Sequence, residues 1–302
     1  MAENIVFVTG HEFGIRALEG MLSSRPFIDG RLRFPLVIGL DSSHAAKTVG
    51  YADAGCLARE YGMDYVSTRD GSLRSSAEII GQVSPDYLVV IGWSWLVAPE
   101  ILSLPAGSAQ NVGGDRGLYS SIGMHPTQLP RGRGRAPIPW TIIKGLQRTA
   151  LSVFFMAPSA DSGPLIAQYH LSVREGETSA SLFRRFAHLH HVAGREMACA
   201  MASSTLLGQA QDEKSATTWP RRNPDDGLIH PGMDCLSIDR LVRALSGPYP
   251  RAYIQRNGRN IPVVATVRSP SKVTTGRSGV LPFSCADGRI LLVLDESVQV
   301  NE

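Results

Sequence analysis

Cysteine is scarce in this chain, and its spacing excludes the commonest structural uses of the residue. The four cysteines, Cys56, Cys199, Cys235 and Cys285, are far apart and form no C-x-x-C pair. Such spacing indicates neither a zinc knuckle nor a disulfide framework. We therefore expect reduced, mostly buried thiols and no bound metal.

Long apolar runs and a strong charge of one sign are also missing. No window approaches the roughly 18 apolar residues of a membrane span, and the N-terminus MAENIVFVTGHEF is acidic and polar where a secretion signal needs a basic start. These features predict a cytoplasmic protein with no membrane partner. The formal charge of +3, from 30 basic and 27 acidic residues, is too small an excess to indicate a nucleic-acid or membrane partner by itself, so we expect a small-molecule substrate.

Apolar material is sufficient for a sizeable core, because 43% of the 302 residues are hydrophobic. Short apolar runs alternate with helix-compatible stretches from the run NIVFVT at residues 4–9 onward. The run YLVVIGWSW at residues 87–95 is typical of a strand buried on both faces. The pattern predicts an α/β domain with a doubly wound, mostly parallel sheet and a site at the carboxyl ends of its strands.

The last third of the chain follows a different pattern. A long helical stretch at residues 177–207 closes the first domain; without a carboxylate at ligand spacing, its His188, His190 and His191 indicate a partly exposed helix end. A polar segment with two X-Pro breakers follows, and Asn257-Gly258 then separates two strand-like runs, a strong hairpin signal. We predict a catalytic domain at 1–208, a linker at 209–226 and a small C-terminal, mainly β (OB-like) domain at 227–302.

The stretch from Gly123 to Gly163 carries three ordered motifs. They are HPTQLP from His125, RGRAPIPW from Arg133, and DSG from Asp161. This order resembles the core of the formyltransferases that use 10-formyltetrahydrofolate, with the pattern Asn-x-His-Pro-Ser/Thr-x-Leu-Pro, Arg-Gly-x-x-Pro-x-x-Trp and Asp-x-Gly. The resemblance covers most of the chain, since the region after Arg221 is similar to the linker and small β domain of methionyl-tRNA and amino-sugar formyltransferases.

The resemblance implies a role for each motif. His125 would exchange protons with the amine and the folate nitrogen, and Asp161 would orient the imidazole and stabilise its cation, tasks that suit a side chain titrating near neutrality. Thr127, Arg133 and Arg135 would bind the substrate, because arginine can hold a carboxylate or phosphate in a bidentate manner. The pterin of the co-substrate 10-formyltetrahydrofolate would contact Trp93, Ser94, Trp95, Leu96, Val97, Ser159, Ala160 and Gly163.

One position departs from the family pattern. Gly123 stands where the family has asparagine, so the usual side-chain donor to the developing oxyanion is missing. Loss of such a donor typically lowers turnover by about 10²- to 10³-fold. Four replacements are open: a backbone N–H near Gly123, an ordered water, protonated His125, or Asn111.

The resemblance leaves several acceptors open. The central motifs look closest to hydroxyornithine transformylases of siderophore biosynthesis and to the related sugar enzymes. We favour N5-hydroxyornithine, or ornithine, because a hydroxylamine nitrogen is largely neutral at cytoplasmic pH and depends less on a complete catalytic set. The alternatives are a nucleotide-linked amino sugar, methionyl-tRNA, and a folate-binding protein whose site has lost its activity.

Overall fold

The computed structural model describes residues 2–106, 120–268 and 279–295. The chain divides into two compact units. The first comprises Met1–Gly134, Thr149–Leu171 and Arg184–Thr218, and the second comprises Arg135–Arg148, Ser172–Phe183 and Trp219–Glu302. Chain segments therefore alternate between the units, and each unit is described by itself.

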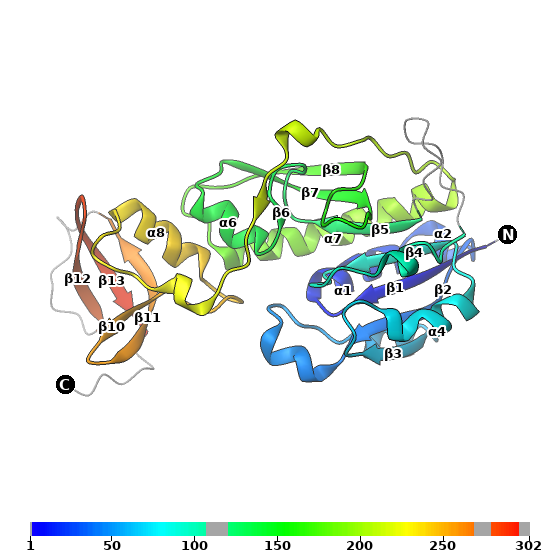
Figure 1. The fold of residues 1–302 in the computed structure, drawn as a ribbon, viewed down its shortest axis with the longest axis horizontal. Coiled ribbons are helices and arrows are strands. Elements are labelled where there is room, and N and C mark those ends of the chain that lie inside the picture. The colour runs from blue at the N-terminus through cyan, green and yellow to red at the C-terminus, as the bar shows by residue number, and fades with distance from the viewer. Residues whose placement is uncertain (1, 107–119, 269–278, 296–302) are drawn as a thin grey trace. The chain divides into compact units, whose positions relative to one another are not determined.

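A seven-stranded sheet forms the first unit, in the order β3-β2-β1-β4-β5-β7-β8 (Figure 1). Neighbouring strands from β3 to β5 run parallel, and β7 is antiparallel to β5. The predicted doubly wound, mostly parallel sheet is confirmed. The strands are β1 (Glu3–Thr9), β2 (Leu32–Leu40), β3 (Asp64–Thr68), β4 (Tyr87–Ile91), β5 (Ser121–His125), β7 (Arg148–Phe155) and β8 (Leu165–Ser172).

Helices and short turns connect these strands. The α-helices of the chain are α1 (Glu12–Leu22), α2 (Arg25–Ile28), α3 (Gly55–Glu60), α4 (Ala77–Val83), α5 (Pro99–Leu102), α6 (Pro137–Ile143), α7 (Ser179–Ala202) and α8 (Cys235–Ala244). The 3₁₀ turns are η1 (Ser42–Lys47), η2 (Arg74–Ser76), η3 (Glu213–Ser215) and η4 (Pro224–Gly227). No helix in the described part of the chain is long and apolar enough to cross a membrane.

Continuous apolar strands place the core of the first unit between the sheet and its helices. Every residue of β4 is buried, as expected for a central strand covered on both faces. Helices α1 and α7 pack closely, because a Cβ atom at Gly194 would lie 2.2 Å from the carbonyl oxygen of Ala17. The ring of His190 stacks on Phe13 at 4.3 Å between centroids.

That stacking corrects the expectation for the histidines of α7. They lie in the middle of the helix, and His190 is 1% exposed instead of lying at a partly exposed end. The helical periodicity was sufficient to predict the helix itself. The burial of His190 depends on the closely packed α1, which is about 170 positions earlier in the sequence.

A four-stranded antiparallel sheet characterises the second unit, in the order β10-β11-β13-β12. Its strands are β10 (Tyr253–Arg256), β11 (Arg259–Val267), β12 (Val280–Cys285) and β13 (Gly288–Leu294). Asn257 and Gly258 both have positive φ, of 52° and 71°, so the expected β10–β11 hairpin is present. The small β domain is confirmed, with four strands among the described residues where an OB fold has five.

The segment read as a linker forms specific contacts with the first unit. Gln211 and Glu213 accept hydrogen bonds from the guanidinium of Arg133. Arg133 lies in the two-residue strand β6 (Arg133–Gly134), which pairs with β9 (Thr218–Trp219). The first unit therefore extends to Thr218, beyond the expected boundary at 208. A polar composition does not reveal that the side chains of this segment bind the first unit.

The cysteines also differ from expectation. Cys56 and Cys199 are exposed, and Cys235 and Cys285 are half-buried. The prediction of mostly buried thiols is therefore wrong. General burial preferences of cysteine do not determine the position of an individual residue on a helix or strand.

Candidate active site

The carboxyl ends of two neighbouring parallel strands place the central residues of the site. Strands β4 and β5 are paired through Ile91 and Met124. His125 is the last residue of β5 and is 7% exposed. The buried strand therefore extends to include His125. Its location agrees with the edge at which open α/β sheets hold their ligands.

Both ring nitrogens of His125 face hydrogen-bond acceptors. Nε2 lies 2.9 Å from the carbonyl oxygen of Gly132, and Nδ1 lies 3.5 Å from Oδ2 of Asp161. A backbone carbonyl only accepts, so Nε2 carries a hydrogen in either protonation state. Nδ1 is thus the atom at which the ring gains or loses its proton, and the resulting cation faces a carboxylate.

A network of hydrogen bonds fixes the loop that carries Asp161. The backbone of Asp161 has a φ of 53°, a left-handed conformation that aspartate tolerates better than most residues. The Gly134 N–H donates to Oδ2 of Asp161 at 2.8 Å. The side-chain amide of Gln211 donates to the carbonyls of Asp161 and Gly163 at 2.8 and 2.7 Å. These contacts hold the Asp161 carboxylate beside Nδ1 of His125. None of them uses a ring nitrogen of His125.

Gly163 meets a packing requirement in the same loop. A Cβ atom there would lie 1.7 Å from the carbonyl oxygen of Phe155, so no larger residue fits without a shift of the backbone. Packing explains this glycine without a ligand. The structure therefore gives no separate support for the expected contact between Gly163 and the co-substrate. Ser159 and Ala160, which precede Asp161, are exposed and remain available for a ligand contact.

Arg133 has a different role from the one expected. It is 9% exposed, and four of its N–H groups donate to Gln211 and Glu213 at distances between 2.6 and 3.2 Å. The guanidinium thus orients Gln211, which in turn holds the Asp161 loop. A direct substrate contact by Arg133 has no support in this geometry. Arg135 belongs to the second unit and is exposed.

The HPTQLP loop is held by residues that the sequence motifs did not identify. Ser152 Oγ donates to the Thr127 carbonyl at 2.6 Å and accepts from the Gln168 amide at 2.9 Å. The Gln168 amide also donates to the carbonyl of Leu129. Ser152 could have been found only from its pairing with His125 across β5 and β7.

Thr127 has a buried side-chain hydroxyl that can still form hydrogen bonds. Its Oγ1 atom is buried, and no described residue hydrogen-bonds to it. Such orphan groups usually bind water or a ligand, because leaving them unpaired costs about 1–3 kcal/mol. The expected substrate contact at Thr127 therefore agrees with its environment.

Gly123 lies opposite Phe154 in the β5–β7 pairing. A Cβ atom at Gly123 would lie 3.0 Å from Cζ of Phe154, so the phenyl ring occupies the space beside the glycine. Glycine has no side chain to donate to an oxyanion, and any larger residue here would require the phenyl ring to shift by a few tenths of an ångström. Asn111, one of the possible replacements, lies outside the described residues.

The segment after β4 presents an apolar surface. Gly92, with φ of 67°, ends the strand, and the Trp93 indole N–H donates to the Gly71 carbonyl at 2.7 Å. Trp95 and Leu96 are 37% and 62% exposed, while Val97 is buried. Ser94 lies between the two tryptophans, whose rings are 5.7 Å apart. This segment follows β4, and His125 ends the adjacent parallel strand β5, so both lie at one edge of the sheet.

Two further histidines of the first unit are held neutral. Burial lowers the pKa of His11 to about 4, and its Nδ1 accepts the Phe13 N–H. Burial, and more weakly the charges of His11 and His125, lower the pKa of His190 to about 3. His190 Nδ1 lies 2.7 Å from the Phe186 carbonyl and carries the hydrogen of that bond. Sequence patterns did not indicate these neutral rings.

Comparisons with known proteins agree with this architecture. Residues 57–196 match the family model described as formyl transferase. The chain is similar to WlaRD, a sugar 3N-formyl transferase solved in the presence of dTDP and 5-N-formyl-THF, with a TM-score of 0.69 and 12% identity over 99% of this chain and 100% of that one.

Two further solved structures share the fold. An N-formyltransferase from Helicobacter canadensis, in complex with folinic acid and dTDP-3-aminofucose, has a TM-score of 0.69 and 14% identity over 98% of this chain and 100% of that one. Methionyl-tRNA formyltransferase from Clostridium thermocellum has a TM-score of 0.57 and 19% identity over 90% and 96%. The match to the formyl transferase model covers residues 57–196, and these three solved structures share the fold of the chain.

Proposed function

We propose that the protein transfers the formyl group of 10-formyltetrahydrofolate to the amine of a small metabolite, with His125 and Asp161 as its catalytic residues. One observation carries the proposal. His125 Nε2 is committed to the Gly132 carbonyl, while Nδ1 faces Asp161 at 3.5 Å. The ring is thereby held in one orientation, with one ring nitrogen next to a carboxylate and available for proton transfer.

The reaction requires one proton to move from the attacking amine to the folate nitrogen. As the new C–N bond forms, Nδ1 of His125 accepts the proton of the amine, and the cation is stabilised by Asp161. As the old C–N bond breaks, Nδ1 returns a proton to the leaving nitrogen. Gly134 and Gln211 keep the carboxylate in place throughout.

The segment after β4 fits the pterin of the co-substrate, which supplies the activated formyl group. Trp95 and Leu96 offer exposed apolar surface for a planar ring. No described residue hydrogen-bonds to the backbone N–H and C=O groups of Leu96 and Val97. These free backbone groups can pair with the donors and acceptors of a pterin edge. Ser159 and Ala160 are exposed residues that can contribute from the Asp161 loop.

We favour N5-hydroxyornithine, or ornithine, as the acceptor because of the missing donor at Gly123. A hydroxylamine nitrogen attacks without first losing a proton, so its reaction depends less on a complete set of stabilising groups. The Oγ1 atom of Thr127 is a polar group that this acceptor would satisfy. A nucleotide-linked amino sugar is the second candidate, since the ligands named for two of the similar structures include dTDP and dTDP-3-aminofucose.

The release of tetrahydrofolate from 10-formyltetrahydrofolate tests two claims. The first is that the protein transfers the formyl group to an amine, and the second is that the preferred amine is N5-hydroxyornithine. We would measure the release with N5-hydroxyornithine, ornithine, a dTDP-linked amino sugar and no amine, across neutral to alkaline pH. Hydroxyornithine should react faster than ornithine at neutral pH, and the difference should narrow as ornithine deprotonates. Equal rates at every pH would remove the hydroxylamine argument, and activity confined to the amino sugar would establish the second candidate.

Matched variants distinguish a catalytic site from a folate-binding site without activity. His125→Gln should lower turnover by about 10²- to 10⁴-fold, the usual contribution of general acid–base catalysis. His188→Gln, at an exposed position of α7, is the control and should leave turnover unchanged. Tight folate binding by the wild-type protein, without amine-dependent turnover by any acceptor, would show that the chain only binds folate.

A further inference from the structure

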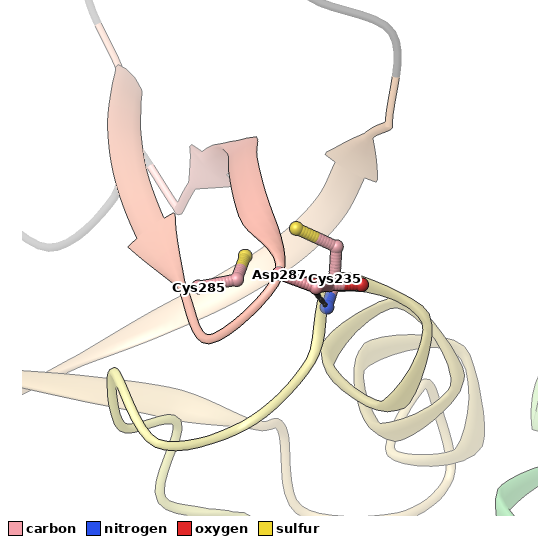
Figure 2. A group of neighbouring side chains, drawn as sticks. All are labelled: Cys235, Cys285 and Asp287. Atoms are coloured by element: carbon pink, nitrogen blue, oxygen red, sulfur yellow. Dashed lines mark hydrogen bonds between the residues drawn. The ribbon is translucent and has the colours of Figure 1, made fainter.

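Three potential metal ligands come together in the second unit, although their spacing in the sequence gives no such indication. Cys235 is the first residue of α8, Cys285 is the last residue of β12, and Asp287 lies in the turn before β13. Both Sγ atoms and a carboxylate oxygen of Asp287 lie within 4.8 Å of one another. Figure 2 shows the side chains of Cys235 and Cys285 approaching each other from the helix and the hairpin.

Two hydrogen bonds hold these residues together without any ligand. The Cys235 N–H donates to Oδ1 of Asp287 at 2.8 Å, as the dashed line in Figure 2 shows. The Ala286 N–H donates to the carbonyl of Met233 at 3.0 Å. The hairpin turn is thus attached to the start of α8 by two hydrogen bonds.

The chemistry of the three side chains selects the type of ion. Two cysteine sulfurs are soft ligands, which favour zinc-type cations over calcium or magnesium, because those prefer sets made entirely of oxygen. Ligand atoms in a tetrahedral zinc site lie about 3.5–3.8 Å apart, given the Zn–S and Zn–O bond lengths. We propose that Cys235, Cys285 and Asp287 bind one thiophilic divalent cation of the zinc class, with solvent at the fourth position.

Access and charge balance are compatible with this site. Asp287 is exposed and both cysteines are half-buried, so an ion can enter from solvent. Binding forms two metal–sulfur bonds and one metal–oxygen bond and releases the thiol protons to the buffer, about two per ion when both thiols start protonated. The bound ion would cross-link α8 to the β12–β13 hairpin, which lies about 50 positions later in the sequence. Metal should therefore stabilise the second unit.

Cobalt(II) is the probe, because its thiolate complexes absorb through sulfur-to-metal charge transfer. We would titrate Co²⁺ into the reduced, metal-free full chain, displace it with Zn²⁺, and record the release of protons in a weakly buffered solution. One ion per chain, a charge-transfer band and a zinc-dependent rise in Tm are expected. Cys235→Ser and Cys285→Ser should each reduce the band, and the double variant should abolish it.

Two other variants complete the experiment. Asp287→Asn keeps an oxygen that accepts the Cys235 N–H, and it should weaken the affinity by at least about tenfold. The control is Cys56→Ser/Cys199→Ser, which removes the two exposed thiols outside the cluster and should bind cobalt normally. Circular dichroism verifies that each variant is folded.

Three results would overturn the proposal. One is a cobalt spectrum without thiolate charge transfer, and another is binding that survives the loss of Cys235 and Cys285 together. The third is reduced protein that takes up no ion, whereas mild oxidation yields a Cys235–Cys285 disulfide in peptide mapping. That last result would assign the pair to thiol–disulfide chemistry instead of metal binding.

Discussion

The ring of Phe154 fills the space beside Gly123, within 3.0 Å of where a Cβ atom of residue 123 would lie. The two residues face each other across β5 and β7, and Phe154 is buried. The lack of a side-chain donor at position 123 and the position of the Phe154 ring are therefore linked by packing. An asparagine at position 123 would therefore press against the Phe154 ring, which would have to shift.

We predict that Gly123→Asn alone destabilises the protein by about 1–3 kcal/mol, the usual cost of overpacking a core, and does not raise turnover. Gly123→Asn combined with Phe154→Leu should recover part of that loss. Denaturant unfolding of both single variants and the double variant measures the coupling, which we expect at about 0.5–3 kcal/mol. Additive effects would show that Phe154 does not determine which residue fits at position 123.

Asp161→Asn should separate charge from position. Asparagine also tolerates the left-handed backbone and can accept the Gly134 N–H, so the loop should keep its structure. The negative charge beside Nδ1 of His125 is lost, and turnover should fall by about 10²- to 10⁴-fold with an unchanged Tm. Asp64→Asn, at an exposed position of β3, is the matched control. Turnover close to that of the wild type would remove Asp161 from the catalytic pair.

Arg133→Lys tests the role that the structure assigns to the buried guanidinium. Lysine retains the charge but cannot contact Gln211 and Glu213 together, so the support of the Asp161 loop should weaken. We expect a lower kcat, an unchanged KM for the amine, and faster hydrogen exchange at residues 209–215. A raised KM with normal exchange would restore a direct substrate contact.

The neutral burial of His190 predicts a dependence of stability on pH. Its pKa is about 3 in the folded chain, against about 6.5 for an unfolded histidine, so the unfolded state binds more protons between these values. Stability should therefore fall as pH decreases through this window. His190→Asn, whose amide can donate to the Phe186 carbonyl, should lose about 2–3 kcal/mol less than the wild type between about pH 7 and about pH 4.5.

Chemical denaturation at several pH values measures this difference. His188→Gln serves as the control, because His188 is exposed on the same helix. Identical pH profiles for the wild type and His190→Asn would mean that folding does not lower the pKa of His190. The inferred neutral ring would then be incorrect.

Two parts of the fold, a buried strand and a hairpin turn, could be predicted from neighbouring residues alone. The continuous apolar run at β4 and the Asn257-Gly258 turn each specify one conformation. The ordered motifs also led to His125 and Asp161, which the structure places 3.5 Å apart. The strand and the turn were predictable because backbone preference is encoded in neighbouring residues, whereas the catalytic roles of His125 and Asp161 stay predictions.

Contacts between distant segments could not be predicted in the same way. Gln211 lies in a polar stretch typical of a linker, yet its amide holds the Asp161 loop some 50 positions away. Cys235 and Cys285 come together only because the hairpin turn is attached to the start of α8. Each of these juxtapositions depends on how the elements pack, which spacing within a motif does not encode.

The most direct test of the account follows the formyl carbon itself. With ¹³C-formyl-labelled 10-formyltetrahydrofolate and N5-hydroxyornithine, NMR should show the label moving to the amine nitrogen as tetrahydrofolate forms in equal amount. His125→Gln should slow this transfer by about 10²- to 10⁴-fold while still binding folate. A label that stays on folate or appears only as formate, with hydroxyornithine, ornithine and the amino sugar alike, would contradict formyl transfer to a small amine.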